Sequence, residues 1–332
     1  MFNVAVELMS SLDEQRLLSI VVIGLNEQER LKASLEAAVA FRPVGYDLEV
    51  LYVDSGSTDR SVAIASAVPG VRVLCVNGSR RSAAIARNVG LRQARGLFVQ
   101  LVDGDSVLQP GWMDAALAVL NETPAVACVF GRCTEMFPDR SVYMRVCGLD
   151  WHMEPGDRRT CGGNSMWRMS VIAAHGYFDE QVRIGEEPDL CYRVRQAGGR
   201  IVCVDAPMVM HDLGMLHFGQ YWRRAVNAGW GYAVIAARYW RRPEKLWLRE
   251  AALNFAEPAS WLGIFTAGWG FAGVLGGSAL LLAWWLLRTL QIANTVKGRG
   301  LQAADALMYG VHCQFVRLPV AVGQLRALFG LR

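Results

Sequence analysis

The 332-residue sequence lacks several patterns that mark common classes of protein. Its eight cysteines include no Cys-x-x-Cys pair, which argues against a structural zinc site. The net charge of +4 is mild and no dense run of lysine and arginine interleaves with aromatic residues, so we expect no nucleic-acid partner. No Gly-x-Gly-x-x-Gly follows the first apolar run, which argues against a dinucleotide-binding oxidoreductase. No internal repeat or low-complexity tract is visible either.

The N-terminal residues also lack the apolar core of a secretory signal peptide, because Glu7, Asp13 and Glu14 interrupt it. The cysteines lie mostly within apolar runs, which favours small buried side chains in a reducing compartment. Both observations lead us to expect that the first half of the chain stays in the cytoplasm.

The first half alternates short apolar runs with helical patterns. We expect strands at residues 17–24, 48–53, 71–76, 97–102, 125–130 and 201–204, and helices at 27–40, 59–68, 82–93 and from Pro110 onward. This alternation predicts an α/β fold with a doubly wound, mostly parallel sheet. Such sheets bind ligands at the carboxyl ends of their strands. Since Asn26, Asp54 and Asp103 each follow a predicted strand, we expect them to share one crevice.

The second half contains an uncharged run at residues 258–287 that exceeds the roughly 20 apolar residues needed to cross a bilayer. A buried core helix is the alternative. Positive residues flank the run on both sides, which favours a re-entrant hairpin with both flanks in the cytoplasm over a single span. Residues 301–331 suit an amphipathic helix in the membrane surface. Residues 133–165 show little periodicity, and we expect a functional loop there.

Two carboxylates one residue apart end the fourth predicted strand, in Val102-Asp103-Gly104-Asp105. Mg²⁺ and Mn²⁺ prefer such oxygen ligands and keep open positions for substrate phosphates. A metal there would neutralise a departing diphosphate. The alternative is a polar turn with a helix N-cap.

Two further polar clusters follow the same logic. Val53-Asp54-Ser55-Gly56-Ser57-Thr58-Asp59 is a strand that enters a glycine-containing turn, whose amides suit a nucleotide, unless it is a plain capped turn. Gly185-Glu186-Glu187-Pro188-Asp189 holds three carboxylates that repel one another. If they fold together near a site, at least one has a raised pKa, as a general base requires. A solvated helix start is the alternative.

In this order the motifs resemble the inverting family-2 glycosyltransferases of the GT-A fold. Three other segments are similar to that family: Leu18 to Glu27, Ala86-Arg87-Asn88-Val89-Gly90 and Gly162-Gly163-Asn164-Ser165. The chain departs from the family pattern at Gly24, where proline is usual, at Ser55, which replaces a second aspartate, and at Glu187, where aspartate is commoner. The resemblance covers roughly residues 18–235.

The resemblance implies a role for each matching residue. The implied nucleotide-binding residues are Asn26, Glu27, Asp54, Ser57, Arg87 and Asp103. The implied metal ligands are Asp103, Asp105 and His211, although a lone histidine is as compatible with a structural role. The implied base is Glu187, with Glu186 and Asp189 as the other candidates. The implied acceptor-binding residues are Gly163, Asn164, Gln220, Arg223 and Arg224.

The segment Gln220-Tyr221-Trp222-Arg223-Arg224 resembles the Gln-x-x-Arg-Trp motif of processive polysaccharide synthases. Arg224 stands where that motif has tryptophan, which puts processivity in doubt. An arginine pair near a membrane suits lipid head groups equally well.

From these observations we expect a nucleotide-sugar glycosyltransferase domain at residues 1–235 and a membrane-associated helical region at 236–332. The resemblance implies a divalent cation, Mn²⁺ or Mg²⁺, and a nucleotide-diphosphate sugar donor. The membrane segment suggests a lipid-linked or polysaccharide acceptor at the cytoplasmic face of the inner membrane. The alternative is a non-catalytic, membrane-bound protein that binds nucleotide sugars.

Overall fold

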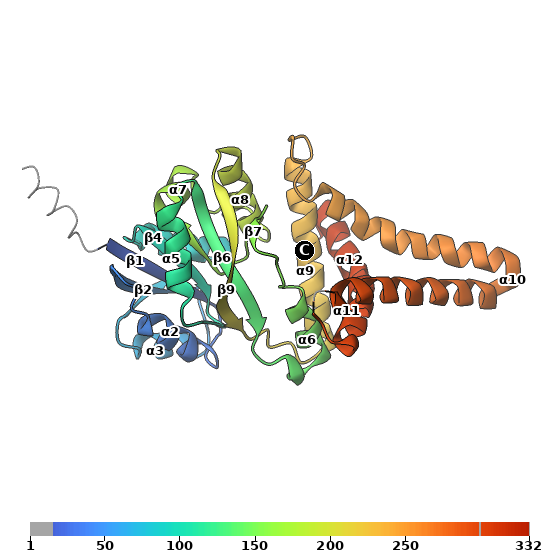
Figure 1. Cartoon of the computed structure of the whole chain (residues 1–332), viewed down its shortest axis with the longest axis horizontal. Coiled ribbons are helices and arrows are strands. Elements are labelled where there is room, and N and C mark those ends of the chain that lie inside the picture. The colour runs from blue at the N-terminus through green and yellow to red at the C-terminus, as the bar shows by residue number, and fades with distance from the viewer. Residues whose placement is uncertain (1–15, 299, 332) are drawn as a thin grey trace, which may run out of the picture. The chain divides into compact units, whose positions relative to one another are not determined.

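A computed structural model describes residues 16–298 and 300–331 and groups them into two units (Figure 1). The first unit comprises the residues up to Met136 together with His152–Leu213, and the second comprises Phe137–Trp151 and the chain from Gly214 onward. Residues 1–15, on which the expectation of no signal peptide rests, lie outside the described residues. The functional boundary predicted at residue 235 stays a prediction.

The first unit is built on a mixed sheet. Within the described residues its strands are β1 (Arg16–Gly24), β2 (Tyr46–Asp54), β3 (Val71–Cys75), β4 (Phe98–Asp103), β5 (Ser106–Leu108), β6 (Val126–Glu135), β7 (Gly156–Asp157), β8 (Ser165–Arg168) and β9 (Arg200–His211). Their order is β3-β2-β1-β4-β8-β6-β9-β5, with β7 paired to β9. Strands β3, β2, β1 and β4 are parallel, as predicted. Strands β5, β7 and β8 pair antiparallel, so the sheet is less parallel than expected.

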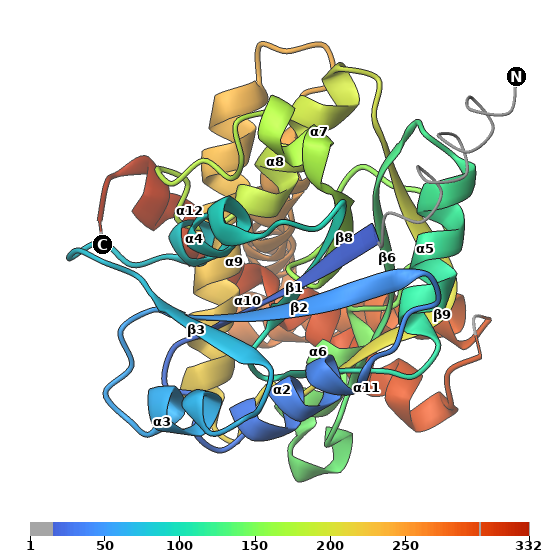
Figure 2. The same ribbon diagram turned by 90° about the vertical axis from the view of Figure 1, so that its left-hand side faces the viewer.

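Helices cover both faces of the parallel strands. The helices of this unit are α2 (Leu31–Ala40), α3 (Ser61–Ser66), α4 (Ala83–Gln93), α5 (Trp112–Glu122), α7 (Met169–Ala174) and α8 (Glu186–Gln196). Figure 2 shows α2 and α3 on one side of β1 to β3 and α4 on the other. This arrangement explains why Leu18, Ile20 and Val21 of β1 are all fully buried, since a strand covered on both faces reads as a continuous apolar run.

Helix α4 lies unusually close to the sheet. A Cβ atom on Gly90 would come within 2.3 Å of Val21 Cγ1, so only glycine permits this approach. The helix begins after Ser82, whose hydroxyl accepts a hydrogen bond from the Ile85 amide at 3.2 Å. Close packing and a fixed start together hold Arg87, one turn into α4, over the ends of the parallel strands.

The second unit is helical. It contains the short 3-10 helix η1 (Pro138–Arg140), α6 (Val142–Leu149), α9 (Phe218–Tyr239), α10 (Leu248–Lys297), α11 (Ala303–Phe315) and α12 (Arg317–Leu328). The loop expected at residues 133–165 was therefore wrong in part, because it includes α6. The single surface helix expected at residues 301–331 is instead two helices. Of these, α12 packs so tightly on α9 that a Cβ atom on Gly323 would lie 1.9 Å from the Val226 carbonyl oxygen.

Helix α10 folds back on itself as a hairpin (Figure 1). Ala272 and Gly273 depart from helical geometry, and Gly273 has a φ of +62°. A Cβ atom on Gly268 would lie 2.7 Å from the Gly276 carbonyl oxygen, so glycine allows the two arms to touch. The uncharged run predicted at residues 258–287 therefore forms a hairpin rather than one straight helix.

The hairpin is long and apolar enough to be a candidate membrane segment, and only 6% of its most apolar window is buried within the protein. Phe271 and Leu275, beside the turn, are 94% and 83% exposed. Each arm carries about 14 uncharged residues, or about 21 Å of helix. That is shorter than the roughly 30 Å hydrocarbon core of a bilayer, so the geometry suits a segment that enters a membrane and returns on the same side.

Candidate active site

Three polar segments meet where the parallel strands end. In the strand register Gly24 lies beside Asp54, and Ile23 lies beside Asp103. The residues that follow β1, β2 and β4 are therefore neighbours, as the alternation of strands and helices predicts.

The segment after β2 is a tight turn organised by Asp54. This carboxylate is buried, and its Oδ2 accepts hydrogen bonds at 2.8 Å from the amides of Gly56 and Ser57. Asn26, with a φ of +59°, closes the turn from the other side by accepting a hydrogen bond from the Thr58 amide at 2.8 Å. These side chains hold one another in place, so the turn presents a defined backbone surface before any ligand arrives.

The structure explains one departure from the family pattern. A Cβ atom on Gly24 would lie 2.9 Å from the Tyr52 hydroxyl oxygen, which leaves little room for any larger residue there. The Tyr52 hydroxyl donates to Asp54 Oδ1 at 3.1 Å. Burial and the neighbouring Asp54 charge raise the pKa of Tyr52, so this hydroxyl stays a donor. Gly24 thus accommodates a tyrosine that supports the turn.

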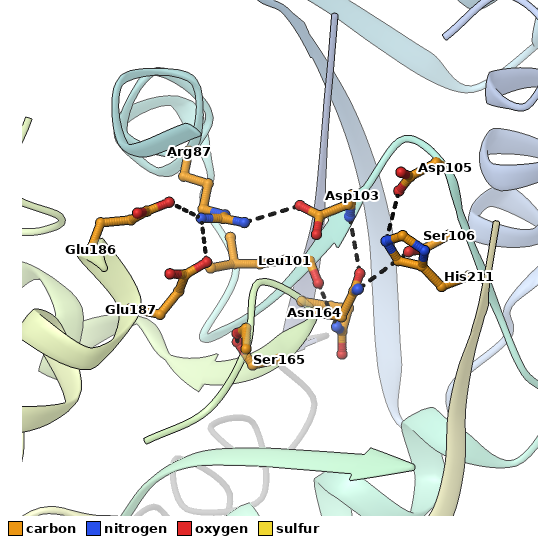
Figure 3. A network of polar contacts seen from close by, with 12 residues as sticks. Arg87, Leu101, Asp103, Asp105, Ser106, Asn164, Ser165, Glu186, Glu187 and His211 are labelled. Carbon is orange, nitrogen blue, oxygen red and sulfur yellow. Dashed lines mark hydrogen bonds and ion pairs between the residues drawn. The ribbon is translucent and has the colours of Figure 1, made fainter. Parts of the chain in front are cut away.

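Arg87 connects two acidic groups (Figure 3). Its Nη1 donates to Glu186 Oε1 and Glu187 Oε1, both at 2.9 Å, and its Nη2 donates to Asp103 Oδ1 at 3.0 Å. The side chain is only 3% exposed, so it is a buried cation among three carboxylates. Burial lowers the pKa of Arg87, but the charges of Glu187, Asp103 and Glu186 raise it by a larger amount. The net pKa is raised, so Arg87 stays protonated.

Glu187 is a largely enclosed carboxylate with a raised pKa. Burial, reinforced by the Glu186 charge, raises its pKa to about 8, while Arg87 opposes the shift. The carboxylate is 17% exposed, so it remains open to a ligand. Glu186 is more enclosed, at 7%. Asp189 is completely buried and accepts a hydrogen bond from Arg193 Nε at 2.9 Å, an arrangement that holds α8 in place.

The loop before β8 packs directly against this network. A Cβ atom on Gly163 would lie 2.3 Å from Arg87 Nη2 and 2.7 Å from Asp103 Oδ2. The buried Asn164 accepts a hydrogen bond from the Asp103 amide at 3.0 Å and donates to Ser106 Oγ at 3.2 Å (Figure 3). Its side chain therefore fixes the backbone between Asp103 and Ser106.

A second acidic group lies in the turn before α2, at Glu27, and in the turn after β4, at Asp105. Burial raises the pKa of Glu27 to about 7; Arg30 opposes the shift, and the charges of Asp105 and Asp103 add to it. Burial also raises the pKa of Asp105, against the influence of His211 and with that of Asp103. Carboxylates with raised pKa values gain from a nearby cation, which removes the cost of holding several negative charges together.

The pairing of β5 with β9 places His211 opposite Ser106, and its Nε2 lies 3.3 Å from Asp105 Oδ1 (Figure 3). Asp105 Oδ1 is buried and has no hydrogen-bond partner among the described residues. An acceptor atom in that position, with Asp103 and an imidazole nearby, fits the oxygen-rich donor set of Mn²⁺ or Mg²⁺. The predicted metal ligands Asp103, Asp105 and His211 therefore lie in one part of the first unit.

The three remaining predicted residues belong to the second unit. The Gln220 side chain caps α9, because its Oε1 accepts hydrogen bonds from the amides of Leu216 and His217 at 2.9 Å. Arg223 is exposed. Arg224 lines a cavity of the second unit.

Sequence reasoning missed Arg30. Its Nη2 lies 2.5 Å from Glu27 Oε2, and its Nη1 donates to the Asp212 carbonyl oxygen at 3.0 Å. The Glu27–Arg30 spacing of three residues was the available signal, since such pairs meet on one face of a helical turn. Arg30 therefore ties the acidic group at the start of α2 to the segment after His211.

Comparison with known proteins shows that this chain is similar to glycosyltransferases. The family model described as glycosyl transferase family 2 matches residues 19–172. The chain is 30% identical over 178 residues to a pre-mycofactocin glycosyltransferase of Mycobacterium tuberculosis, a match that covers 50% of this chain and 37% of the relative. It is 28% identical over 207 residues to the succinoglycan biosynthesis protein ExoO of Rhizobium meliloti, covering 55% of this chain and 56% of that protein.

A third relative is a glucosyl-dolichyl phosphate glucuronosyltransferase of Haloferax volcanii, 24% identical over 216 residues, with 58% of this chain and 68% of that protein covered. Among solved structures, the mannosyltransferase PcManGT from Pyrobaculum calidifontis, in complex with GDP-Man and Mn²⁺, has a TM-score of 0.66 at 18% identity. That likeness covers 97% of this chain and 89% of the other. It confirms the predicted GT-A-like α/β fold. The chain spans 37% and 56% of the first two relatives.

Proposed function

We propose that this chain, whose residues 19–172 belong to glycosyl transferase family 2, moves a sugar from a nucleotide-diphosphate sugar to an acceptor hydroxyl with inversion. The observation that carries the proposal is the placement of Arg87 between Asp103 and Glu187. One buried cation thereby links the carboxylate suited to a metal with the carboxylate suited to a base. Donor activation and acceptor deprotonation would then occur on either side of one fixed residue.

In this mechanism the turn of Asp54 and Asn26 receives the nucleoside. Asp103, Asp105 and His211 would hold a divalent cation, which supplies charge neutralisation to the departing diphosphate. Glu187 removes the proton from the acceptor hydroxyl. The freed oxygen forms a bond to the anomeric carbon from the side opposite the diphosphate, the bond to that leaving group breaks, and the configuration inverts.

The α10 hairpin supports an acceptor made at a membrane. Its exposed apolar arms suit insertion into one leaflet, and the charged residues at both ends favour the cytoplasmic face. A lipid-linked or polysaccharide acceptor in cell-surface glycan synthesis fits this placement. The names of two relatives, a succinoglycan biosynthesis protein and an enzyme of a dolichyl phosphate glycan, support the same two acceptor classes.

The metal assignment is tested by isothermal titration of Mn²⁺ and nucleoside diphosphates into the Asp105→Asn variant. We expect Mn²⁺-dependent nucleotide affinity to fall at least tenfold, because a charged ligand is lost. Asp47→Asn, an exposed aspartate of the same unit, is the matched control and should bind as wild type does. Equal affinity in Asp105→Asn and Asp47→Asn would refute the metal site.

The catalytic assignment is tested by Glu187→Gln, with Glu122→Gln on an exposed site as its control. Glu187→Gln should bind donor normally and lose sugar transfer. A non-catalytic nucleotide-sugar-binding protein, the alternative function, would show no transfer in the wild type under any combination of donor and cation. Persistent transfer in Glu187→Gln would make Glu186 the candidate base.

A further inference from the structure

The second unit contains a cavity of about 400 Å³ that the proposed mechanism does not use. Residues from five helices line it, and two of them, Arg224 of α9 and Arg317 of α12, carry positive charge. We propose that this cavity binds the phosphate group of a membrane lipid. The identification of that lipid as the carrier of the acceptor hydroxyl rests on the proposed function.

The first argument is an arginine that faces the cavity without a counter-ion. Within residues 16–298 and 300–331, Arg224 forms no hydrogen bond or ion pair. A guanidinium group offers a planar set of donors that matches phosphate oxygens, and it is weakly hydrated, so it binds such groups well. Arg224 is therefore available to a ligand, because no interaction with another protein group has to be broken first.

The second argument is the state of Arg317. It donates through Nη1 to Asn254 Oδ1, whereas its Nε is buried and has no hydrogen-bond partner among the described residues. The nearest carboxylate, Glu257, lies 3.8 Å from that Nε. A buried donor with an unmet hydrogen bond is unfavourable unless a ligand or water satisfies it. The asparagine contact also fixes the arginine at the cavity wall.

The one carboxylate in the wall is already committed. Asp150 Oδ1 accepts a hydrogen bond from the Tyr309 hydroxyl at 2.8 Å, and Oδ2 lies 3.1 Å from His312 Nε2. The other ring nitrogen of His312 lies 2.9 Å from the Tyr221 hydroxyl. The lining holds two arginines and one hydrogen-bonded aspartate, and Glu257 beside the lining pairs with Arg317, so Arg224 is the positive charge that remains for an anion.

The third argument is the position of the cavity relative to the hairpin. Asn254, which lines the cavity, lies on the first arm of α10, eight residues or about 12 Å of helix before Leu262, which is 66% exposed. Between them, Trp261 packs against Trp285 of the other arm with tilted rings whose centroids are 5.0 Å apart. Tryptophan is enriched at membrane interfaces. An inserted hairpin would therefore place the cavity at the level of the lipid phosphates, outside the hydrocarbon core.

Free phosphate shares the chemistry of a lipid phosphate, and the cavity alone does not separate them. The exposed apolar arms beside it favour the lipid, because an acyl or isoprenoid chain could lie along them. A metal ion is a different occupant: ligand atoms of Cys147, Asp150 and His312 lie within 4.8 Å of one another. Vesicle binding, competition with inorganic phosphate and metal analysis distinguish the lipid, the free phosphate and the metal ion.

The test uses the full chain and phosphatidylcholine vesicles that contain either dolichyl phosphate or the neutral alcohol dolichol. Wild-type protein should bind the phosphate-containing vesicles more tightly. Arg224→Gln should lose about tenfold or more of that preference, as expected for a charged hydrogen bond. Arg317→Gln should do the same. Arg249→Gln, an exposed arginine of α10 outside the cavity, is the matched control and should retain the preference.

Several outcomes would overturn the proposal. Equal binding of phosphate-containing vesicles by Arg224→Gln and Arg249→Gln would show that the cavity does not bind the lipid phosphate. Displacement of the protein from the vesicles by equimolar inorganic phosphate would identify a site for the free ion. Stoichiometric zinc in the purified protein, lost in Cys147→Ser, would identify a metal site.

Donor hydrolysis separates this proposal from the proposed function. It reports on the first unit and is measured in the wild type, whereas Arg224→Gln is followed by vesicle binding and by a fall in sugar transfer to a hydroxyl of a glycan carried on dolichyl phosphate. Phosphate-dependent vesicle binding without any donor hydrolysis in the wild type would leave the lipid site standing and refute the enzyme. Normal donor hydrolysis without phosphate-dependent vesicle binding would leave the proposed enzyme standing and refute the lipid site. Arg224 is exposed, so its replacement should not prevent folding, and an unchanged melting temperature verifies this.

Discussion

Replacement of Arg87 with methionine should destabilise the first unit strongly and in a pH-dependent way. The side chain is 3% exposed and contacts three carboxylates at 2.9–3.0 Å. Removal of one partner from a buried ion pair costs about 3–5 kcal/mol, because the remaining charges stay buried without compensation. For a domain of about 200 residues this corresponds to a fall in melting temperature of about 6–20 °C.

The pH dependence follows from the same carboxylates. The pKa of Glu187 in the folded protein is already raised from 4.5 to about 8, and loss of the arginine raises it further. When the pKa of a carboxyl group is raised in the folded state, the free energy of unfolding falls as pH rises from the unfolded-state pKa toward the folded-state pKa. Below about pH 8 Glu187 is protonated in both folded proteins, so the deficit of Arg87→Met should be smallest there and should grow as pH rises above about 8.

Thermal unfolding of wild type and variants at one pH well below 8 and one well above it measures the effect. Arg92→Met is the matched control on the same helix: its ion pair with Glu180 is 3.2 Å long, and the arginine is 54% exposed, so it should cost at most about 1 kcal/mol. Equal melting temperatures for Arg87→Met and Arg92→Met would refute the reasoning. A deficit that does not change with pH would refute the part that assigns it to the carboxylates.

Three further changes test other parts of the structure. The wild-type rate of sugar transfer should rise with pH through about 8, because the base Glu187 must lose its proton, and a rate that falls over this range would contradict that role. Gly163→Ala should lower transfer by about 10²-fold, since its Cβ atom would lie 2.3 Å from Arg87 Nη2 and 2.7 Å from Asp103 Oδ2 and would displace both; unchanged steady-state kinetics would contradict this packing. Gly323→Ala should destabilise the second unit by about 1–3 kcal/mol, because its Cβ atom would lie 1.9 Å from the Val226 carbonyl oxygen, and a melting temperature equal to that of wild type would argue against the close contact of α9 and α12.

The parallel part of the sheet was predictable because its signals are local. Strands β1, β2 and β4 are apolar runs of six to nine residues, each bounded by polar turn residues. The antiparallel part was not predictable. Strands β5, β7 and β8 are two to four residues long, too short to show periodicity, and long-range pairing alone makes them strands.

The helical unit shows the same division. Composition was enough to identify the uncharged run at residues 258–287. The pattern of charges favoured a hairpin, and the contact of Gly268 with Gly276 defines where the two arms meet. The assignment of α6 to this unit had no local signal, because it depends on contacts with residues far along the chain, such as the ion pair of Arg145 with Asp305.

By itself, the sequence determined the order of the motifs, the family resemblance and the residue types at the candidate site. Such information is carried by neighbouring residues, and a strand end followed by a polar turn reads the same in any context. Only the tertiary structure decided that Arg87 joins Asp103 to Glu187 and that Arg224 lines a cavity with Arg317. These partners lie between 16 and 100 residues apart, and the pKa of Glu187 depends on their burial and distance, which exist only once the chain has folded.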